Sequence, residues 1–209
     1  MIYHSTRDEK LTAAPTRAVL EGIAPDGGLY VCDPGKLDFD WQGTLQKDTM
    51  SMAADILGAL LPDFQDMNGL VQASYAGKFA SDDLTPLVPV GERYVLELYH
   101  GPTSAFKDVA LSVLPRLVSA AAKQEGAGDV VILTATSGDT GKAALEGFHD
   151  VPGTRIMVFY PAGGVSPVQE AQMVTQEGGN VRVCAIRGNF DDAQTGVKNV
   201  FAACKGKDL

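Results

Sequence analysis

The sequence has few cysteines, a deficit of positive charge and no long apolar run, and each shortage excludes a class of protein. Its three cysteines form no Cys-x-x-Cys pair and do not cluster with the three histidines, which excludes a disulfide framework and a zinc site and suits a reducing compartment. With 17 basic against 26 acidic residues, the chain lacks the basic surface that nucleic acids and anionic membranes require. No segment approaches the roughly 18 apolar residues of a membrane span, and the N-terminus has no apolar signal segment. We therefore expect a cytoplasmic protein that binds no nucleic acid, no membrane and no metal.

What the sequence does contain favours an α/β protein with two domains. Hydrophobic residues make up 45% of the chain, enough to bury a core. Residues 1–95 predict a small α+β domain with a strand at 29–31 after a Pro-Asp-Gly-Gly turn, helices at 48–63 and 67–79, and a hairpin within 84–99. In the first of these helices, apolar side chains recur on one face: Met52, Ile56, Leu60 and Leu61.

The pattern in residues 96–209 predicts a second domain with a parallel sheet, because predicted strands and helices alternate there. Such alternation is typical of strands joined by right-handed crossovers. The continuous apolar run at 129–135 is typical of a strand buried on both faces. Further strands are expected at 155–161, which we expect to be buried, and at 180–186.

The helices of this second domain are expected at 105–122, 142–148, 167–177 and 189–203. Ser166 as N-cap and Gln169 as its partner predict a capping box at the start of the third helix, and two glycines, at 178 and 179, are expected to end it. Pro115 falls inside the first helix, where it removes a backbone hydrogen bond, so we expect a kink near Leu111.

The loop from Thr136 to Gly141, TSGDTG, lies between a predicted strand and a predicted helix. Parallel sheets bind ligands at the carboxyl ends of their strands, and a helix start offers unpaired N–H groups and a positive dipole end to an anion. Its hydroxyls add donors, so the loop is a candidate site for a carboxylate or a phosphate. The nucleotide-binding patterns GxxxxGK[ST] and GxGxxG are absent. The competing interpretation is an ordinary tight turn.

Lys107 stands at the start of a predicted helix among apolar neighbours that include Phe106 and Val109. Apolar surroundings and the positive end of a helix both favour the neutral amine, which is the nucleophilic form. Asp108 opposes this effect if it points inward. A solvated surface lysine is the alternative. A reactive lysine together with an anion-binding loop suggests a carbonyl cofactor with a phosphate group, and pyridoxal phosphate (PLP) is the obvious candidate.

Two stretches, HGPTSAFKD at 100–108 and TATSGDTGKAA at 134–144, resemble the signature segments of the threonine synthases, which are PLP enzymes of fold type II, the tryptophan-synthase β fold. Further segments resemble the same family in the same order: YHSTR, APDGGLYV, YPAGGVSPVQEAQM and GNFDDAQ. The resemblance covers essentially the whole chain. It implies that residues 1–95 are the N-terminal domain of such an enzyme and that residues 96–209 are the first part of its PLP-binding domain.

The resemblance also implies roles for individual residues. Lys107, next to Phe106, would carry the cofactor as a Schiff base, and Asp139 would lie at the cofactor's phenolic oxygen, where related enzymes usually have asparagine. The substrate carboxylate would be bound by loop residues, namely Thr136, Ser137, Gly138, Thr140 and Gly141. Apart from the resemblance, Lys142, His100 and Ser104 lie near enough in sequence to be candidates for contact with the substrate phosphate, and a structural role is the alternative for each.

The implied reaction converts O-phospho-L-homoserine and water to L-threonine and phosphate, with Lys107 as cofactor carrier and as acid and base. Family members are about twice as long as this chain, whose length fits only one or two domains of roughly 100 to 200 residues each. We therefore expect a C-terminal half of the same enzyme as its partner. Without that half, we expect the chain to be inactive. Two alternatives stay open. One is another fold-type II activity, such as a dehydratase or a cysteine synthase, and the other is a non-catalytic module.

Overall fold

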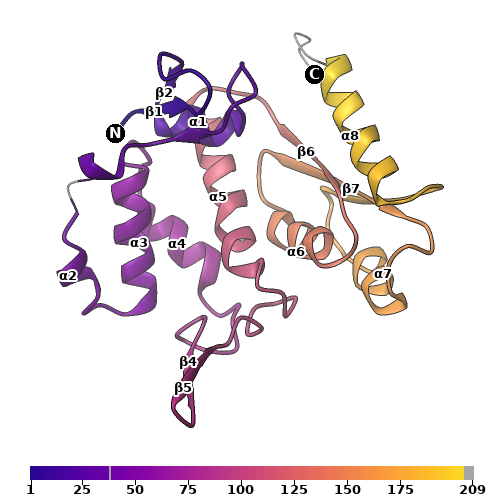
Figure 1. Cartoon of the computed structure of the whole chain (residues 1–209). Helices are drawn as coiled ribbons and strands as arrows, with labels where there is room; N and C mark the ends of the chain where they lie inside the picture. Colours follow the sequence, from indigo (N-terminus) through magenta and orange to yellow (C-terminus); the bar gives the residue numbers. More distant parts are fainter. Residues whose placement is uncertain (38, 205–209) are drawn as a thin grey trace. The chain divides into compact units, whose positions relative to one another are not determined.

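The computed structural model describes residues 1–37 and 39–204 (Figure 1). The chain divides into two compact units. Unit 1 comprises residues 1–97 and 116–128, and unit 2 comprises residues 98–115 together with the chain from 129 onward. Helix α5, Asp108–Gln124, therefore contributes its first half to unit 2 and its second half to unit 1. The predicted domain boundary at residues 95 and 96 stays a prediction.

Unit 1 combines two small antiparallel sheets with helices, as expected for an α+β domain. The first sheet has the strand order β2-β1-β3 and the second is the predicted hairpin β4-β5. The strands are β1 (Tyr3–Ser5), β2 (Thr12–Ala13), β3 (Tyr30–Val31), β4 (Leu87–Val90) and β5 (Arg93–Leu96). The helices are α1 (Pro15–Glu21), the 3-10 helix η1 (Pro34–Lys36), α2 (Trp41–Thr44), α3 (Thr49–Leu60) and α4 (Met67–Tyr75).

The two predicted helices of unit 1 are confirmed, but the apolar face expected for α3 is only partly right. Asp48 and Asp66 cap α3 and α4, because their side chains accept hydrogen bonds from backbone N–H groups in the first turn. In α3, Ala54 is buried, whereas Ile56 is 40% exposed. Small and large side chains both satisfy a helical repeat, so the spacing alone does not identify which of them face the core.

Unit 2 contains the predicted parallel sheet, with strand order β6-β7-β8 and parallel register throughout. Helices α6 and α7 cover one face of the sheet and α8 lies against the other (Figure 1). The elements are β6 (Val130–Ala135), α6 (Asp139–Phe148), β7 (Thr154–Pro161), α7 (Pro167–Val174), β8 (Val181–Ile186) and α8 (Phe190–Cys204). The core of this unit consists of Ala144, Leu145, Phe148, Ile156, Val158, Tyr160, Met173 and Val181.

Two details of unit 2 correct the sequence predictions, and a third agrees with them. Strand β6 is not buried on both faces, because the side chain of Val131 at its amino end is 50% exposed. Helix α7 ends at Val174, four residues before Gly178, and its C-cap is Thr175, whose N–H and hydroxyl both donate to the Ala171 carbonyl. The capping box of Ser166 and Gln169 is confirmed.

Helix α5 continues through Pro115 without interruption, so the kink near Leu111 stays a prediction. Proline has no N–H and cannot donate to the Leu111 carbonyl, four residues earlier. That carbonyl instead meets α6 at Gly147: a Cβ built on Gly147 would lie 1.9 Å from the Leu111 oxygen. The first half of α5 is thus packed directly against α6 within unit 2.

In the described residues, no helix combines the length and the apolar character that a membrane span needs. Within the same residues, no group of three or more His, Cys, Asp or Glu side chains gathers as metal ligands. All three cysteines are free.

Candidate active site

Lys107 is the last residue before α5 and closes a tight turn that starts at Gly101. The turn is held by two backbone hydrogen bonds, from Ser104 N to Gly101 O at 3.0 Å and from Asp108 N to Ala105 O at 2.9 Å. Ser104 adopts the left-handed region, with φ 57°, a conformation that is rare for residues other than glycine and occurs often at functional turns. The chain therefore presents Lys107 from a defined loop that leads directly into a long helix.

Asp108 faces this turn. Its buried carboxylate, 2% exposed, accepts hydrogen bonds from Thr103 N at 2.8 Å and from Thr103 Oγ1 at 2.6 Å. Gly101 is needed beside it, since a Cβ there would lie 2.4 Å from Asp108 Oδ2. The direction of Asp108, which the sequence leaves open, is thus into the turn, where it fixes the loop that carries Lys107.

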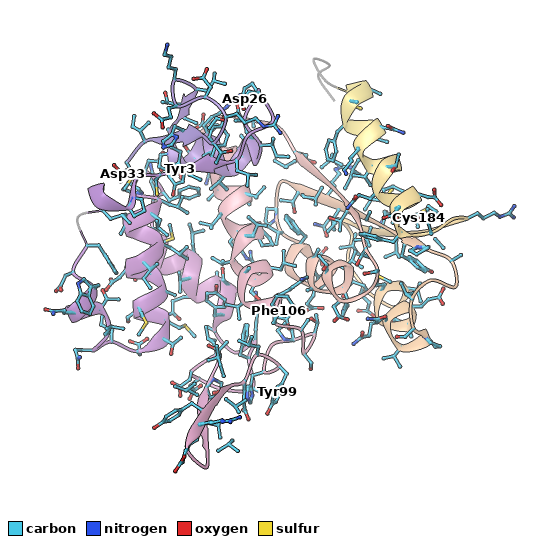
Figure 2. The ribbon with its side chains drawn as sticks, viewed as in Figure 1. Tyr3, Asp26, Asp33, Tyr99, Phe106 and Cys184 are labelled. Atoms are coloured by element: carbon cyan, nitrogen blue, oxygen red, sulfur yellow. The ribbon has the colours of Figure 1, made fainter. Side chains whose placement is uncertain are left out.

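The amine of Lys107 lies over an aromatic ring. Its Nζ is 4.1 Å from the centroid of Phe106, and the lysine itself is half-buried. Phe106 is 60% exposed and lies beside the start of α5 (Figure 2). Among the described residues, no carboxylate forms an ion pair with Lys107. The lysine is therefore a partly covered amine with no anionic partner in that part of the chain.

The 136–141 loop is organised by one buried hydroxyl. Thr136, 2% exposed, accepts hydrogen bonds at Oγ1 from Gly138 N at 3.0 Å and from Gly141 N at 2.9 Å, and donates to Gly138 O at 3.1 Å. The sequence suggested this hydroxyl as a donor to a ligand. The structure instead uses it to hold the loop in shape.

Two glycines of the loop are required by space and backbone conformation. Gly138 has φ 145°, and a Cβ there would lie 2.3 Å from the side-chain nitrogen of Gln169. A Cβ on Gly141 would lie 2.4 Å from the methyl group of Thr136. The sequence TSGDTG is therefore matched to this particular turn, with no room for larger residues at these two positions.

Three backbone N–H groups of the loop are left for a ligand. Within the residues that the structure describes, the N–H groups of Ser137, Asp139 and Thr140 have no hydrogen-bond acceptor. They lie at the amino end of α6, where the helix dipole is positive. Unpaired donors at such a place can bind carboxylates and phosphates, and the anion site expected from the sequence stays a prediction.

Asp139, in the same loop, is bound to α7. Gln169 Nε2 donates to Asp139 Oδ1 at 2.8 Å, while Gln169 Oε1 accepts from Ser166 N at 3.1 Å. The sequence pattern assigns Gln169 only to the capping box and does not indicate its contact with Asp139. A capping box places its Glu or Gln side chain at the helix start, but the pattern does not indicate that another loop lies next to it.

The three candidates for contact with a substrate phosphate differ in their availability. Lys142 is engaged, because its amine binds Glu146 at 3.1 Å and also Gln176. His100 stacks on Tyr99, with ring centroids 4.7 Å apart. Ser104 is exposed in the turn before Lys107. None of these contacts identifies a phosphate site, and the assignment stays a prediction.

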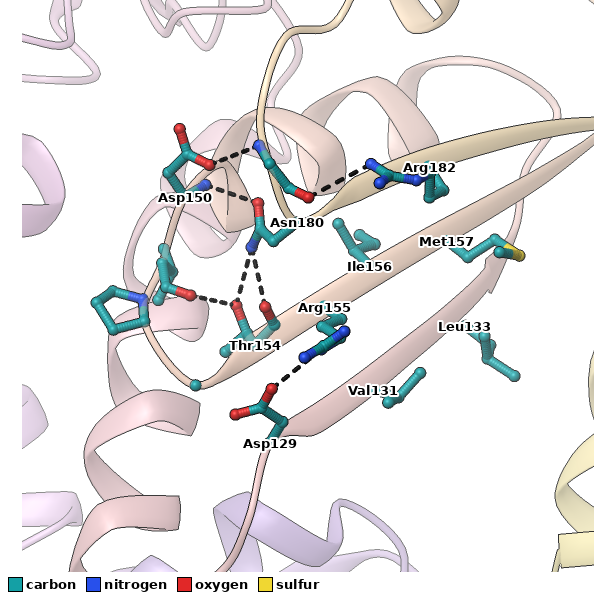
Figure 3. A pocket seen from close by; sticks show the side chains of 14 residues that line it. Asp129, Val131, Leu133, Asp150, Thr154, Arg155, Ile156, Met157, Asn180 and Arg182 are labelled. Atoms are coloured by element: carbon teal, nitrogen blue, oxygen red, sulfur yellow. Dashed lines mark hydrogen bonds and ion pairs between the residues drawn. The ribbon is translucent and has the colours of Figure 1, made fainter. Parts of the chain in front are cut away.

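Lys107 and the loop belong to the same compact unit, and Leu111, one turn after the lysine, packs against the core from which α6 also projects. No hydrogen bond or ion pair joins Lys107 to residues 136–141 in the described part of the chain. A hollow elsewhere on the unit is lined by none of the predicted site residues (Figure 3). It lies at the amino ends of the strands, beside the Arg155–Asp129 ion pair, whereas the loop is at the carboxyl end of β6.

Comparison with known proteins gives a consistent result. Residues 2–88 match the family described as threonine synthase N terminus. The chain is 39% identical to the threonine synthase of Pseudomonas aeruginosa over 97% of its own length, and 35% identical to that of Saccharomyces cerevisiae over 96%. It covers 44% and 43% of those two proteins, so it spans less than half the length of these relatives.

Solved structures show the same relationship. The crystal structure of PLP-bound threonine synthase from Brucella melitensis matches 98% of this chain with a TM-score of 0.89 and 38% identity, over 45% of its own length. The threonine synthase of Escherichia coli matches 97% with a TM-score of 0.79 and 32% identity. The fold of the chain is therefore that of the corresponding part of these fold-type II enzymes.

Proposed function

The chain belongs to the threonine synthase family, of which it spans the N-terminal part, and from this premise we propose that its protein converts O-phospho-L-homoserine and water to L-threonine and phosphate. The observation that supports the proposal best is the pair of features in unit 2: a half-buried amine without an anionic partner among the described residues, and a loop with three unpaired N–H groups. We propose a cytoplasmic location for the protein, in keeping with its three free cysteines.

The residues present fit pyridoxal phosphate. When bound, the cofactor supplies an aldehyde that condenses with amines and a ring that withdraws electrons from the substrate's α-carbon. Lys107 would hold the cofactor through its amine, and Asp139 would contact the ring hydroxyl. The exposed side of Phe106 would cover the cofactor and limit access of water.

The chain's own residues have three tasks in this proposal. The N–H groups of Ser137, Asp139 and Thr140, with the Ser137 and Thr140 hydroxyls, orient the substrate carboxylate. Thr136 keeps these groups in position through the bonds of its buried hydroxyl, and the lack of side chains at Gly138 and Gly141 lets Gln169 and Thr136 pack directly against the loop. Lys107, once released from the cofactor, takes the proton from the substrate's α-carbon, which the neutral amine can do.

We propose that a C-terminal part of the protein packs against the exposed hairpin β4-β5. Apolar side chains are exposed on both of its faces: Leu87 60%, Tyr94 70% and Leu96 53% on one, Val90 58% and Val95 47% on the other. A two-stranded hairpin is only marginally stable alone. Pro89 has no backbone N–H to donate, so a further strand would pair with β5 and not with β4. Because the matched relatives are more than twice as long, we propose their C-terminal part as the occupant.

The activity is tested on a protein that joins this chain to the C-terminal part found in the relatives. We expect phosphate and threonine in equal amounts from O-phospho-L-homoserine. Lys107→Ala should lower the rate by at least about 100-fold, whereas Lys123→Ala, which changes an exposed lysine of the same helix, should leave it unchanged. After borohydride reduction, peptide mapping should find the pyridoxyl group on Lys107. A label on another lysine would refute the assignment, and a keto acid with ammonia as products would indicate a dehydratase.

The hairpin is tested on the 209-residue chain alone. We expect this chain to bind PLP weakly, to have no activity and to bind a hydrophobic dye strongly, because its apolar hairpin is uncovered. Changing Tyr94 and Leu96 to lysine should remove much of the dye signal. Dye binding at the level of an ordinary compact monomer, or turnover by the chain alone, would show that it needs no C-terminal part.

A further inference from the structure

Gln169 bridges two elements of unit 2 with an amide whose orientation is fixed. The backbone N–H of Ser166 can only donate, so the atom that faces it at 3.1 Å must be the amide oxygen of Gln169. The amide nitrogen then faces Asp139 Oδ1 at 2.8 Å and donates to it. The capping box of α7 therefore determines which group is presented to the 136–141 loop.

The helix that carries this amide is itself held to the sheet. Tyr160, on β7 and 3% exposed, donates through its hydroxyl to Glu170 Oε1 at 2.8 Å, and this hydrogen bond raises the pKa of the Tyr160 hydroxyl. Glu170 directly follows Gln169, so the first turn of α7 cannot shift along the sheet without breaking this bond. The position of Gln169 is consequently fixed by its hydrogen bonds with Ser166 and by the bond from Tyr160 to the neighbouring Glu170.

Gln169 touches two residues of the loop. Its amide occupies the space that a Cβ on Gly138 would need, at 2.3 Å, and it binds one oxygen of Asp139. The other oxygen of Asp139, Oδ2, has no partner in the described part of the chain and stays available as an acceptor. Asp139 is exposed, so without the amide its side chain would be free to turn away from a ligand.

We propose that Gln169 is a positioning residue for the cofactor: it fixes Asp139 Oδ1 so that Oδ2 accepts a hydrogen bond from the ring hydroxyl of pyridoxal phosphate. The inference rests on the proposed function and adds to it a residue that does not itself touch the cofactor. The chemistry is that of a carboxylate with one oxygen held by an amide donor and the other offered to an aromatic hydroxyl.

The test uses the longer, cofactor-binding protein described above and two variants. Gln169→Glu has nearly the same shape and keeps the oxygen that accepts from Ser166 N, but it loses the donor to Asp139 and places a second carboxylate beside it. Ser166→Ala removes the hydroxyl that accepts from Gln169 N at 3.2 Å and leaves the contact with Asp139. The measurements are the dissociation constant of PLP, the absorbance maximum of the bound cofactor and the thermal midpoint.

We expect Gln169→Glu to weaken PLP binding by at least about tenfold, as the loss of a hydrogen bond to a charged group implies, and to shift the absorbance maximum while the thermal midpoint stays close to that of the unaltered protein. Ser166→Ala should lower the thermal midpoint and change PLP binding by less than about threefold. If Gln169→Glu and the unaltered protein have the same PLP affinity and spectrum, the role of Gln169 is refuted and the proposed function is not. Equal losses of PLP affinity in Gln169→Glu and Ser166→Ala would have the same meaning. An unaltered protein that does not bind PLP would overturn the proposed function and this inference with it.

Discussion

Replacing Gly147 by alanine should destabilise the chain, although alanine is the better helix former. Gly147 lies in α6, where a Cβ would be 1.9 Å from the Leu111 carbonyl oxygen and 3.3 Å from Pro115 Cγ. Ordinary van der Waals contact begins at 3.4 Å, so the first distance is about 1.5 Å too short. The obstacle is backbone, which cannot rotate away as a side chain can, so α5 and α6 would have to separate.

The magnitude follows from two opposing effects. Alanine gains about 1 kcal/mol over glycine inside a helix, whereas forcing an extra carbon into a packed contact costs about 1–3 kcal/mol, with backbone contacts at the upper end. We therefore expect Gly147→Ala to lose about 2 kcal/mol of unfolding free energy, which lowers the thermal midpoint by about 4–8 °C for a chain of this size.

Gly58→Ala provides the matched control. Gly58 lies in α3, and a Cβ there would meet no atom within 4 Å, so this variant should show only the gain in helix propensity, about 1 kcal/mol. Urea and thermal unfolding, followed by circular dichroism, would measure both variants. If Gly147→Ala is as stable as the unaltered chain while Gly58→Ala behaves as expected, then α5 and α6 are not packed as described.

Two further predictions concern buried polar groups. Asp108→Ala should cost about 2 kcal/mol in urea unfolding, because Thr103 loses the acceptor of both its N–H and its hydroxyl; an unchanged midpoint would mean that the turn is not held by this carboxylate. Burial raises the pKa of Tyr75 to about 12, from its ordinary value of 10.0, so the unfolded chain loses this proton first and stability should fall as pH rises from 10 towards 12. Tyr75→Phe should show a shallower fall over that range in unfolding experiments at constant salt, and an equal slope would contradict the role of Tyr75.

The sequence predicted local structure well where the physical cause is local. The capping box at Ser166 depends on residues three apart, and the parallel strands of unit 2 follow from apolar runs that alternate with helices. Strand β6 shows the limit of this reasoning. Its run of apolar residues indicates what can be buried, whereas the exposure of Val131 depends on which elements pack next to it.

The use of the polar groups in the candidate site could not be predicted from the sequence. Asp108 had two possible directions, and the choice depends on the left-handed Ser104 and on the absence of a side chain at Gly101, which together bring Thr103 to the carboxylate. Gln169 meets Asp139 across 30 residues of sequence. Contacts of this kind arise from tertiary packing, to which single-sequence patterns are insensitive.

The structure of the 136–141 loop also indicates which of its groups can discriminate between ligands. If side-chain hydroxyls bound the anion, Thr136 would be the strongest donor by position, but its hydroxyl is already used by Gly138 and Gly141. The remaining capacity lies mainly in backbone N–H groups, whose spacing is set by the turn and not by the side chains. For the anion site that we propose, a change at Thr136 should therefore weaken binding of every anion by distorting the loop, whereas a change at the exposed Ser137 should weaken only ligands that contact its hydroxyl.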